Sequence, residues 1–364
     1  MTDNSRSDSF TYWSFGFIYC AFIYFFSVFF LQQFILNSCS LSLVGNDWGS
    51  YINTAEIISN LDLVDVVAIL QARWGIVDPG YWGLTYLLSN FTDSESYTPI
   101  LNVSVVALSI VLARPLLNSF QLLIFTVFTT TSFSFLQSII LLPRQFCAYF
   151  IWQIAVYCFL VARDKNNRSN IILMILLAVS FHWSITFSLA MVLTPRLVGL
   201  LTRNRFKVGI SSFLSIGIAC AALFVAVRLN LAYKIFIYLS SNTENDLSRG
   251  IFSFFLPFFV LILLRKFTFT NFSPLYNHKM LQAKMIINHV LVSSFLLYVY
   301  FVLSQSLGIS RITLTLYSIL VPIAAFSFLV SSQNMRSIIL SAYLFLFGSI
   351  EMYRISRIIE YISC

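Results

Sequence analysis

Long hydrophobic runs separated by short polar segments make up most of this sequence of 364 residues. Apolar residues account for 59% of the chain and charged residues for only 10%, with a mean hydropathy of +0.84. A soluble globular domain carries about 25% charged residues, and a helix that crosses a bilayer needs about 20 apolar residues. The pattern therefore predicts an all-α, polytopic integral membrane protein with about 11 (10–12) spanning helices, forming a single domain over residues 1–364.

Cutting the sequence at its hydrophobic runs gives the limits of the predicted spans. Residues 37–98 form the longest polar segment, between the first span and the second. Cations flank residues 169–201 on both sides, so this stretch is predicted to form two short helices that meet at His182. The other predicted spans cover residues 11–35, 99–113, 116–142, 143–163, 208–229, 250–264, 285–303, 311–330 and 337–348.

Charged residues are divided unequally between the two faces that the loops reach. One face receives 14 Lys and Arg residues, including five of the six Lys, whereas the other receives seven Arg, one Lys and 11 of the 14 acids. The positive-inside rule assigns the first face to the cytoplasm and makes segment 37–98 an extracytoplasmic loop. The sequence therefore predicts a multi-pass protein of the inner (cytoplasmic) membrane. Its net charge of +8 reflects this orientation and not a nucleic-acid partner.

Three arginines lie where a helix dipole disfavours a cation. Arg144, Arg249 and Arg311 each stand in the first turn of a helix predicted to run from the outer face to the inner face. A cation there costs roughly 0.3–1 kcal/mol, but an anion would meet free N–H groups, the dipole and a guanidinium together. The three are hypothesised to form a cradle for pyrophosphate. The alternative is that each contacts lipid headgroups or pairs with an acid in a loop.

Two further residues are candidates for proton transfer. His182, in the segment Ala-Val-Ser-Phe-His-Trp-Ser, is a titratable group at membrane depth and could take a proton from a sugar hydroxyl near neutral pH. Asp47 precedes Tyr51 by four residues, so both lie on one face if the segment is helical. The acid would then contact or deprotonate acceptor hydroxyls, and the aromatic ring would stack on sugar. The alternatives are a hydrogen-bonded interfacial histidine and an N-cap aspartate.

The motif Asp78-Pro-Gly-Tyr81 also has two interpretations. An aspartate followed by proline fits the N-cap and first position of a helix, so capping alone explains the pair. The acid and Tyr81 could equally contact a sugar substrate. Arg73 is the only cation in segment 37–98 and is expected to pair with Asp78 or with a ligand.

Signatures of metal and nucleotide chemistry do not occur in the sequence. It contains no HExxH, P-loop, GxGxxG or GxSxG motif, and its six Cys form no CxxC or Cys/His cluster. Nucleotide hydrolysis and metalloprotease chemistry therefore have no support in the sequence, and neither a metal nor a cofactor is predicted.

Four short motifs follow one another in an order typical of a known family. They are Gly45-Asn-Asp47…Tyr51, Asp78-x-Gly80-Tyr81, Arg144-Gln145 and Phe181-His182-x-Ser184. This order resembles the EpsG/Wzy-like family of polytopic polysaccharide polymerases over about residues 40–200, and the rest of the chain resembles it by hydropathy and Arg311. The family often carries Glu where this chain has Asp78.

The resemblance implies a metal-independent glycosyltransferase with a GT-C-like fold. Such an enzyme would join oligosaccharide repeat units carried on undecaprenyl pyrophosphate, at the outer face of the cytoplasmic membrane, to make O-antigen, capsule or exopolysaccharide. Its partners would be the lipid-linked oligosaccharide, the bilayer, and a chain-length regulator and flippase of the same pathway. The expected catalytic residues are His182 and Asp47; the expected substrate- and pyrophosphate-binding residues are Arg144, Gln145, Arg249, Arg311, Arg73, Asp78, Tyr51 and Tyr81.

Two other functions stay open at this point. A membrane acyltransferase that modifies polysaccharide would use an intramembrane histidine close to the inner face. A flippase for lipid-linked oligosaccharide would show two-fold internal repeats, and the sequence shows none.

Overall fold

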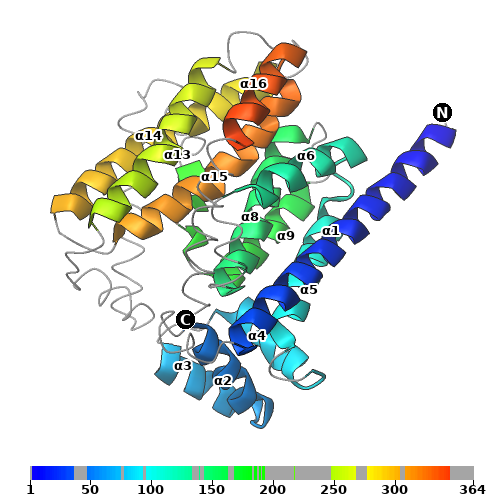
Figure 1. Cartoon of the computed structure of the whole chain (residues 1–364), viewed down its shortest axis with the longest axis vertical. Helices are drawn as coiled ribbons and strands as arrows, with labels where there is room; N and C mark the ends of the chain where they lie inside the picture. Colours follow the sequence, from blue (N-terminus) through cyan, green and yellow to red (C-terminus); the bar gives the residue numbers. More distant parts are fainter. Residues whose placement is uncertain are drawn as a thin grey trace. The chain divides into compact units, whose positions relative to one another are not determined.

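The computed structural model of the chain is helical throughout the part that it describes (Figure 1). The elements within this part are all α-helices, which confirms the predicted fold class at that level. The described residues are 2–36, 47–74, 78–92, 96–132, 143–162, 168–182, 247–267, 277–303 and 308–344, with 139, 217 and several positions between 184 and 192.

Residue contacts divide the chain into two compact units. The first consists of residues 1–66, 78–183 and 337–364, and the second of residues 67–77 and 184–336. The residue limits of the units fall inside helices α3 (Leu63–Trp74) and α16 (Gln333–Tyr343), so each of these helices has residues in both units. The helices that lie wholly in the first unit are α1 (Thr2–Leu36), α2 (Asp47–Ser59), α4 (Pro79–Ser89), α5 (Tyr97–Ala113), α6 (Ser119–Thr130), α8 (Pro143–Val161) and α9 (Arg168–Phe181).

Helix α8 forms the core of the first unit. It is apolar on every side, and 89% of it is buried, as expected for a helix surrounded by others. Helices α5, α6 and α9 all contact it. Its aromatic side chains join the layers, because Phe150 stacks on Tyr19 of α1 at 6.1 Å between ring centroids and meets Phe125 of α6 edge-on at 5.8 Å.

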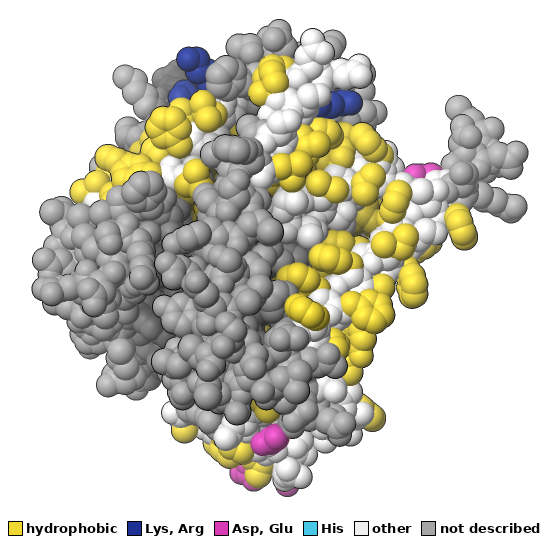
Figure 2. Space-filling view, viewed as in Figure 1, with side chains coloured by type: hydrophobic (Ala, Val, Ile, Leu, Met, Phe, Trp, Pro, Cys, Tyr) yellow, Lys and Arg dark blue, Asp and Glu magenta, His cyan; other side chains and the backbone are white. Residues whose placement is uncertain are grey.

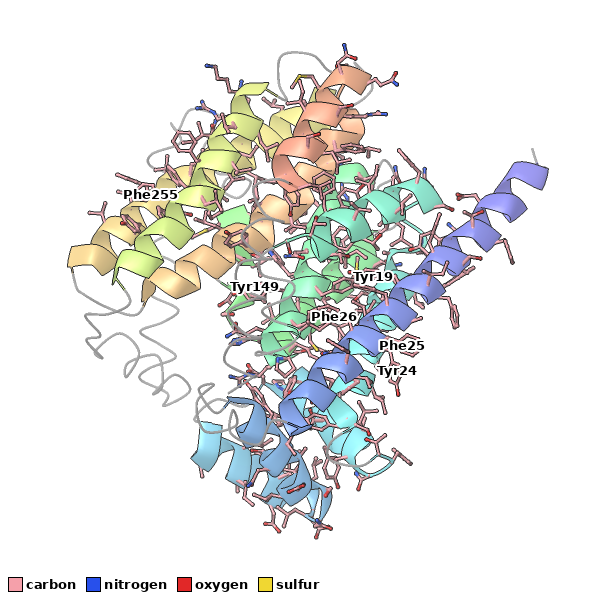
Figure 3. All side chains as sticks on the ribbon, in the orientation of Figure 1. Tyr19, Tyr24, Phe25, Phe26, Tyr149 and Phe255 are labelled. Carbon is pink, nitrogen blue, oxygen red and sulfur yellow. The ribbon has the colours of Figure 1, made fainter. Side chains whose placement is uncertain are left out.

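Helix α1 has one packed side and one bare apolar side. On the packed side the Tyr12 hydroxyl donates a hydrogen bond of 2.9 Å to the carbonyl of Ile110 in α5. On the other side Phe17 and Phe25 are 77% and 69% exposed, and hydrophobic side chains run along the helix in Figure 2. Figure 3 shows Tyr24 and Phe25 projecting away from the neighbouring helices. An apolar strip of this size suits contact with lipid.

The second unit contains a group of three helices that all contact one another. They are α13 (Leu247–Phe267), α14 (Asn277–Leu303) and α15 (Gly308–Val330). Tyr298 of α14 stacks on Phe254 of α13 with centroids 4.3 Å apart. Helices α13 and α15 begin at the same end of the group (Figure 1).

The helices agree with several predicted spans. Spans 99–113, 250–264 and 311–330 fall within α5, α13 and α15, and the span from 143 matches α8. Two helices in the described ranges are long and apolar enough to cross a membrane, Asp8–Phe29 and Pro143–Val161. The count of about 11 spans and the GT-C-like fold stay predictions.

Other boundaries differ from the prediction. Helix α1 begins at Thr2 rather than at residue 11, and α16 begins within a segment expected to be a loop. Segment 37–98, predicted to be an extracytoplasmic segment that does not span, contains α2, α3 and α4, of which α2 and α4 begin where the Asp47 and Asp78 motifs allowed for helices. The single span 116–142 is wrong, because α6 ends at Thr130. There the hydroxyls of Thr131 and Ser132 donate 2.7 Å hydrogen bonds to the carbonyls of Val127 and Thr129 in the last turn of the helix. The predicted span 208–229 lies outside the described residues apart from residue 217.

Candidate functional site

Asp78 stands directly before α4 but does not cap it. Its backbone is extended, with φ −88° and ψ 95°, and Pro79 occupies the first helical position, as the sequence predicted. Within the described residues, however, the Asp78 side chain makes no capping hydrogen bond to the helix. Capping alone therefore does not account for this carboxylate, which is 2% exposed and has turned toward α8 and α9.

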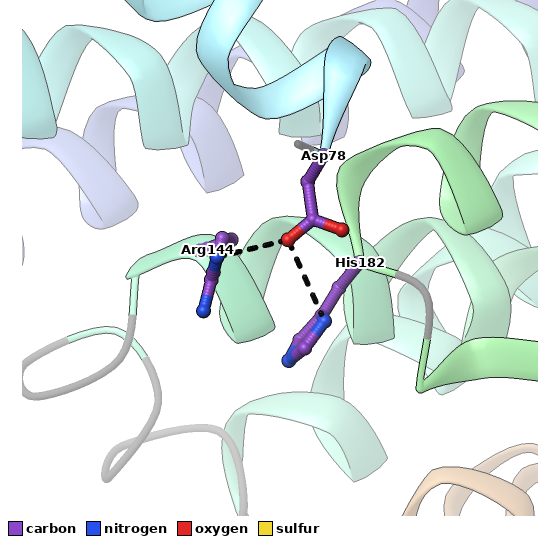
Figure 4. A network of polar contacts seen from close by, with 3 residues as sticks. All are labelled: Asp78, Arg144 and His182. Atoms are coloured by element: carbon purple, nitrogen blue, oxygen red, sulfur yellow. Dashed lines mark ion pairs between the residues drawn. The ribbon is translucent and has the colours of Figure 1, made fainter. Parts of the chain in front are cut away.

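Arg144 in the first turn of α8 pairs with that carboxylate. Its Nη1 lies 2.9 Å from Oδ2 of Asp78 (Figure 4). Two charges this close and this poorly hydrated attract one another strongly, and the ion pair fixes the start of α8 against the start of α4. The Arg144 side chain is 16% exposed, so the ion pair is accessible from outside the protein on the arginine side. The sequence predicts that Arg73 pairs with Asp78 or with a ligand; the side chain of Arg73 lies outside the described residues, so this stays a prediction.

His182 brings the third group to the same carboxylate. It follows the last residue of α9, and its backbone N–H donates a 3.1 Å hydrogen bond to the carbonyl of Ala178. Its Nδ1 lies 3.8 Å from Oδ2 of Asp78, the same oxygen that Arg144 contacts (Figure 4). This distance is too long for a hydrogen bond but short enough for the carboxylate to stabilise a protonated imidazole. We name Asp78, Arg144 and His182 the acid–histidine–arginine cluster.

Aromatic rings pack beside the Arg144 end of the cluster. The guanidinium carbon of Arg144 lies 5.8 Å from the ring centroid of Tyr51 in α2, within the range of a cation–π contact. The Tyr51 ring packs against Tyr81 at 5.7 Å and Trp82 at 6.0 Å, and the Tyr81 hydroxyl lies 3.5 Å from that of Tyr97. Tyr51 is 2% and Tyr81 0% exposed, so in this structure the rings pack on Arg144 and each other instead of offering an open sugar-stacking face.

The buried phenol of Tyr81 is held in its neutral form. Removal from water, followed by the nearby Tyr97 and Tyr51, raises the pKa of Tyr81 well above its usual value of 10.0. Tyr81 therefore remains a hydrogen-bond donor across the physiological pH range and does not serve as a proton acceptor.

The other predicted site residues are placed only in part. Gln145 is 3% exposed, and its Oε1 makes no hydrogen bond within the described part of the chain. Asp47 opens α2, so it shares that helix with Tyr51 as the spacing predicted. Arg249 and Arg311 lie in the first turns of α13 and α15, also as predicted. The side chains of Asp47, Arg249 and Arg311 lie outside the described residues, and the pyrophosphate cradle stays a prediction.

Sequence reasoning missed two residues that the structure places around the cluster, Trp82 and Tyr97, which are buried in the aromatic support. A signal existed for Trp82, since it lies four residues after Asp78, but nothing in the sequence shows what it faces. Gly80 is part of the Asp78-x-Gly80-Tyr81 motif without an assigned role, and the structure places it against the residues that precede His182.

The described residues hold no group of three or more His, Cys, Asp or Glu able to bind a metal ion. What the cluster does offer is a buried carboxylate that lies 2.9 Å from a guanidinium and 3.8 Å from an imidazole ring. This combination suits an enzyme that moves a proton beside an anionic group.

The comparisons with known proteins agree with this class of enzyme. The model of the EpsG family matches residues 18–363, nearly the whole chain, and the chain therefore belongs to the EpsG family. The members of this family are Wzy-like polysaccharide polymerases and membrane proteins. Comparison with curated proteins and with solved structures gives no match.

Proposed function

We propose that the chain is a metal-independent membrane glycosyltransferase that joins undecaprenyl-pyrophosphate-linked oligosaccharide repeat units. The reaction takes place at the outer face of the cytoplasmic membrane, in the synthesis of O-antigen, capsule or exopolysaccharide. One observation carries the proposal: in a member of a polysaccharide polymerase family, Oδ2 of Asp78 lies 2.9 Å from Arg144 and 3.8 Å from His182. A base and an anion site next to one another are what glycosyl transfer from a pyrophosphate requires.

The reaction forms one bond and breaks one bond at a single carbon. A hydroxyl oxygen of the acceptor repeat unit attacks the anomeric carbon of the donor sugar. The bond from that carbon to the pyrophosphate oxygen breaks, and its electron pair leaves with undecaprenyl pyrophosphate. The hydroxyl proton passes to His182, which later releases it to water. No metal or redox partner is needed to balance these steps.

Each group of the cluster has a role in this scheme. Asp78 stabilises the imidazolium that forms when His182 takes the proton. Arg144 and the N–H groups at the start of α8 bind the leaving pyrophosphate. Arg249 and Arg311 add further positive charge, while Gln145 and Arg73 contact the substrate. Tyr51 and Tyr81 hold Arg144 in place.

Asp47 is the competing base. Asp47 is the first residue of α2, and the same helix supplies Tyr51, whose ring contacts Arg144. Asp47 is therefore a carboxylate, in addition to Asp78, on a helix that contacts Arg144. In that variant of the mechanism Asp47 accepts the proton, and His182 only orients the acceptor.

The same proposal includes the whole-protein features that the family implies. The chain folds into about 11 spans in a GT-C-like arrangement and works with a flippase and a chain-length regulator of its pathway. The exposed aromatic strip of α1 supports membrane embedding, since Phe17 and Phe25 would otherwise face water.

Gene deletion tests the function directly. Surface polysaccharide from the deletion strain should run on a gel as lipid-linked single repeat units. The wild-type gene should restore the ladder of longer chains, and Asp78→Asn at matched expression should not. Complete loss of surface polysaccharide would point to the flippase instead. Chains of normal length that have lost acyl groups would point to the acyltransferase, and either result overturns the proposal.

A further inference from the structure

Helices α4 and α9 meet at a residue that has no side chain. The two helices pack against one another, and Gly80 in the first turn of α4 lies at the contact. A Cβ placed on Gly80 would lie 2.9 Å from Cδ2 of Phe181 and 3.1 Å from the backbone carbonyl carbon of Ser180, and it would collide with Oγ of Ser180. Separations under 3.0 Å are essentially never seen for real Cβ atoms, so a side chain here forces a shift at the contact. The Ser180 hydroxyl would have to leave the carbonyl of Leu177, to which it donates a 2.8 Å hydrogen bond, the Phe181 ring would have to turn, and the α9 backbone at 3.1 Å would have to give by a few tenths of an ångström.

This contact lies between two groups of the cluster. Gly80 follows Asp78 by two residues, and Ser180 and Phe181 come directly before His182. Asp78 and His182 are each attached directly to a helix. Asp78 immediately precedes α4, and the backbone N–H of His182 still donates to the carbonyl of Ala178 in α9. A displacement at Gly80 is therefore passed on to the 3.8 Å separation between Asp78 and His182.

We propose that Gly80 is a positioning residue, whose missing side chain lets α4 and α9 approach closely enough to hold Asp78 against His182. The expected effect of Gly80 on the rate of transfer rests on the proposed function. Its expected effect on the separation between Asp78 and His182 does not depend on that function. Gly80 itself touches neither substrate nor the reacting atoms in this scheme.

The chain supplies a matched control three residues away. Gly83 is also in α4, is exposed, and has nothing within 4 Å of a Cβ built on it. Replacing a helical glycine by alanine gains about 1 kcal/mol in helix propensity. Gly83→Ala adds a methyl group to the same helix without the collision, so it is the control for a contact with α9 that only Gly80→Ala disturbs.

The first readout is polymer synthesis in the deletion strain. Gly80→Ala should slow transfer by roughly 10–10²-fold, the size expected when a reacting group is misplaced by about 1 Å. The gel should show shorter chains for Gly80→Ala and normal chains for Gly83→Ala. Gly80→Ala with Ser180→Ala removes one of the colliding atoms and should recover part of the length.

The second readout reports geometry and needs no activity. The sequence has only three His, so selectively labelled histidine in the detergent-purified full chain gives few signals, and His182→Ala identifies the one from His182. Asp78→Asn supplies the ring shifts of His182 without its carboxylate neighbour. Gly80→Ala should move the His182 signals toward those of Asp78→Asn, whereas Gly83→Ala should leave them in place.

The two readouts separate the two proposals. His182 signals in Gly80→Ala that coincide with those of the wild type overturn the positioning role, whatever the gel shows. Signals that move while polymer length stays normal support positioning and remove His182 from the proposed mechanism. If Gly80→Ala does not fold, the double variant with Ser180→Ala carries the test, and wild-type signals in that variant overturn the proposal.

Discussion

The Asp78 carboxylate determines how the other two residues of the cluster can act. It is buried and contacts Arg144 at 2.9 Å, so removal of either partner leaves a poorly hydrated charge without its counter-charge. A broken pair of this kind costs about 3–5 kcal/mol when both groups are fully buried, and less here because Arg144 is 16% exposed. In the proposed mechanism Asp78 therefore contributes to both stability and catalysis.

Arg144→Lys should lose most polymer synthesis although it keeps the charge. A lysine ammonium cannot offer the planar pair of donors that binds a phosphate bidentately, and it loses the planar stacking of the guanidinium near Tyr51, 5.8 Å from the ring centroid. Tyr51→Phe is the matched control, since it keeps the ring and should retain long chains. Polymer length on a gel at equal expression measures both. Near-normal chains from Arg144→Lys would count against pyrophosphate binding at this residue.

His182→Ala should insert normally and bind lipid-linked sugar, yet slow transfer by about 10²–10⁴-fold, the usual contribution of general-base catalysis. His182→Asn should be equally poor if proton transfer is the role, because an amide can hydrogen-bond but cannot accept the proton. Single-turnover rates with purified lipid-linked repeat units would measure the loss. Asp47→Asn is measured in parallel. An active His182→Asn enzyme beside an inactive Asp47→Asn enzyme would move the base to Asp47.

At the residue scale, the sequence identified the members of the cluster but not their partners. Asp78, Arg144 and His182 each stood out by residue type and local motif. Their meeting depends on how α4, α8 and α9 pack, and local patterns carry no information on that packing. For this reason the sequence predicts a pairing of Arg73, the only cation in segment 37–98, with Asp78 or with a ligand, and does not predict the pairing of Asp78 with Arg144.

At the element scale, helix starts were the most predictable features. Pro143 at the start of α8 has a fixed backbone angle suited to the first turn and lacks the N–H that would go unpaired there. The end of α6 was not predictable in the same way. A run of apolar residues continues past Thr130, and hydrogen bonds from Thr131 and Ser132 to the last turn accompany the end of the helix.

The helix starts also predict which arginines matter. Arg311→Lys should shorten the polymer strongly, because Arg311 lies in the first turn of α15, where N–H groups and the dipole favour an anion. Arg249→Lys at the start of α13 should have a milder effect. Arg265→Lys is the control, since Arg265 is exposed in the last turn of α13, where any cation is favourable. Equal chain lengths from Arg311→Lys and Arg265→Lys would remove Arg311 from the pyrophosphate site.

At the scale of the whole molecule, α1 and α8 show two ways in which an apolar helix is accommodated. Helix α8 is 89% buried among other helices, whereas the Asp8–Phe29 part of α1 is 28% buried and leaves a strip of aromatic side chains exposed. Both helices read as similar hydrophobic runs in the sequence, since hydropathy does not distinguish lipid from protein as the surrounding medium. The helices alone do not show orientation, whereas the charge pattern predicts which face is cytoplasmic and which is extracytoplasmic.

That orientation predicts which positions an impermeant thiol reagent reaches in intact cells. In a chain without native cysteines, Phe91→Cys should label, because residue 91 belongs to segment 37–98, predicted to be outside. Leu281→Cys should label only after the membrane is opened, because it belongs to the Lys-rich segment that precedes residue 285, predicted to be inside. Phe91 and Leu281 are 84% and 59% exposed, so a difference between them reports the side of the membrane and not burial. Labelling of Leu281→Cys in intact cells, with Phe91→Cys protected, would reverse the orientation and place the acid–histidine–arginine cluster at the face where an outward-facing polymerase cannot use it.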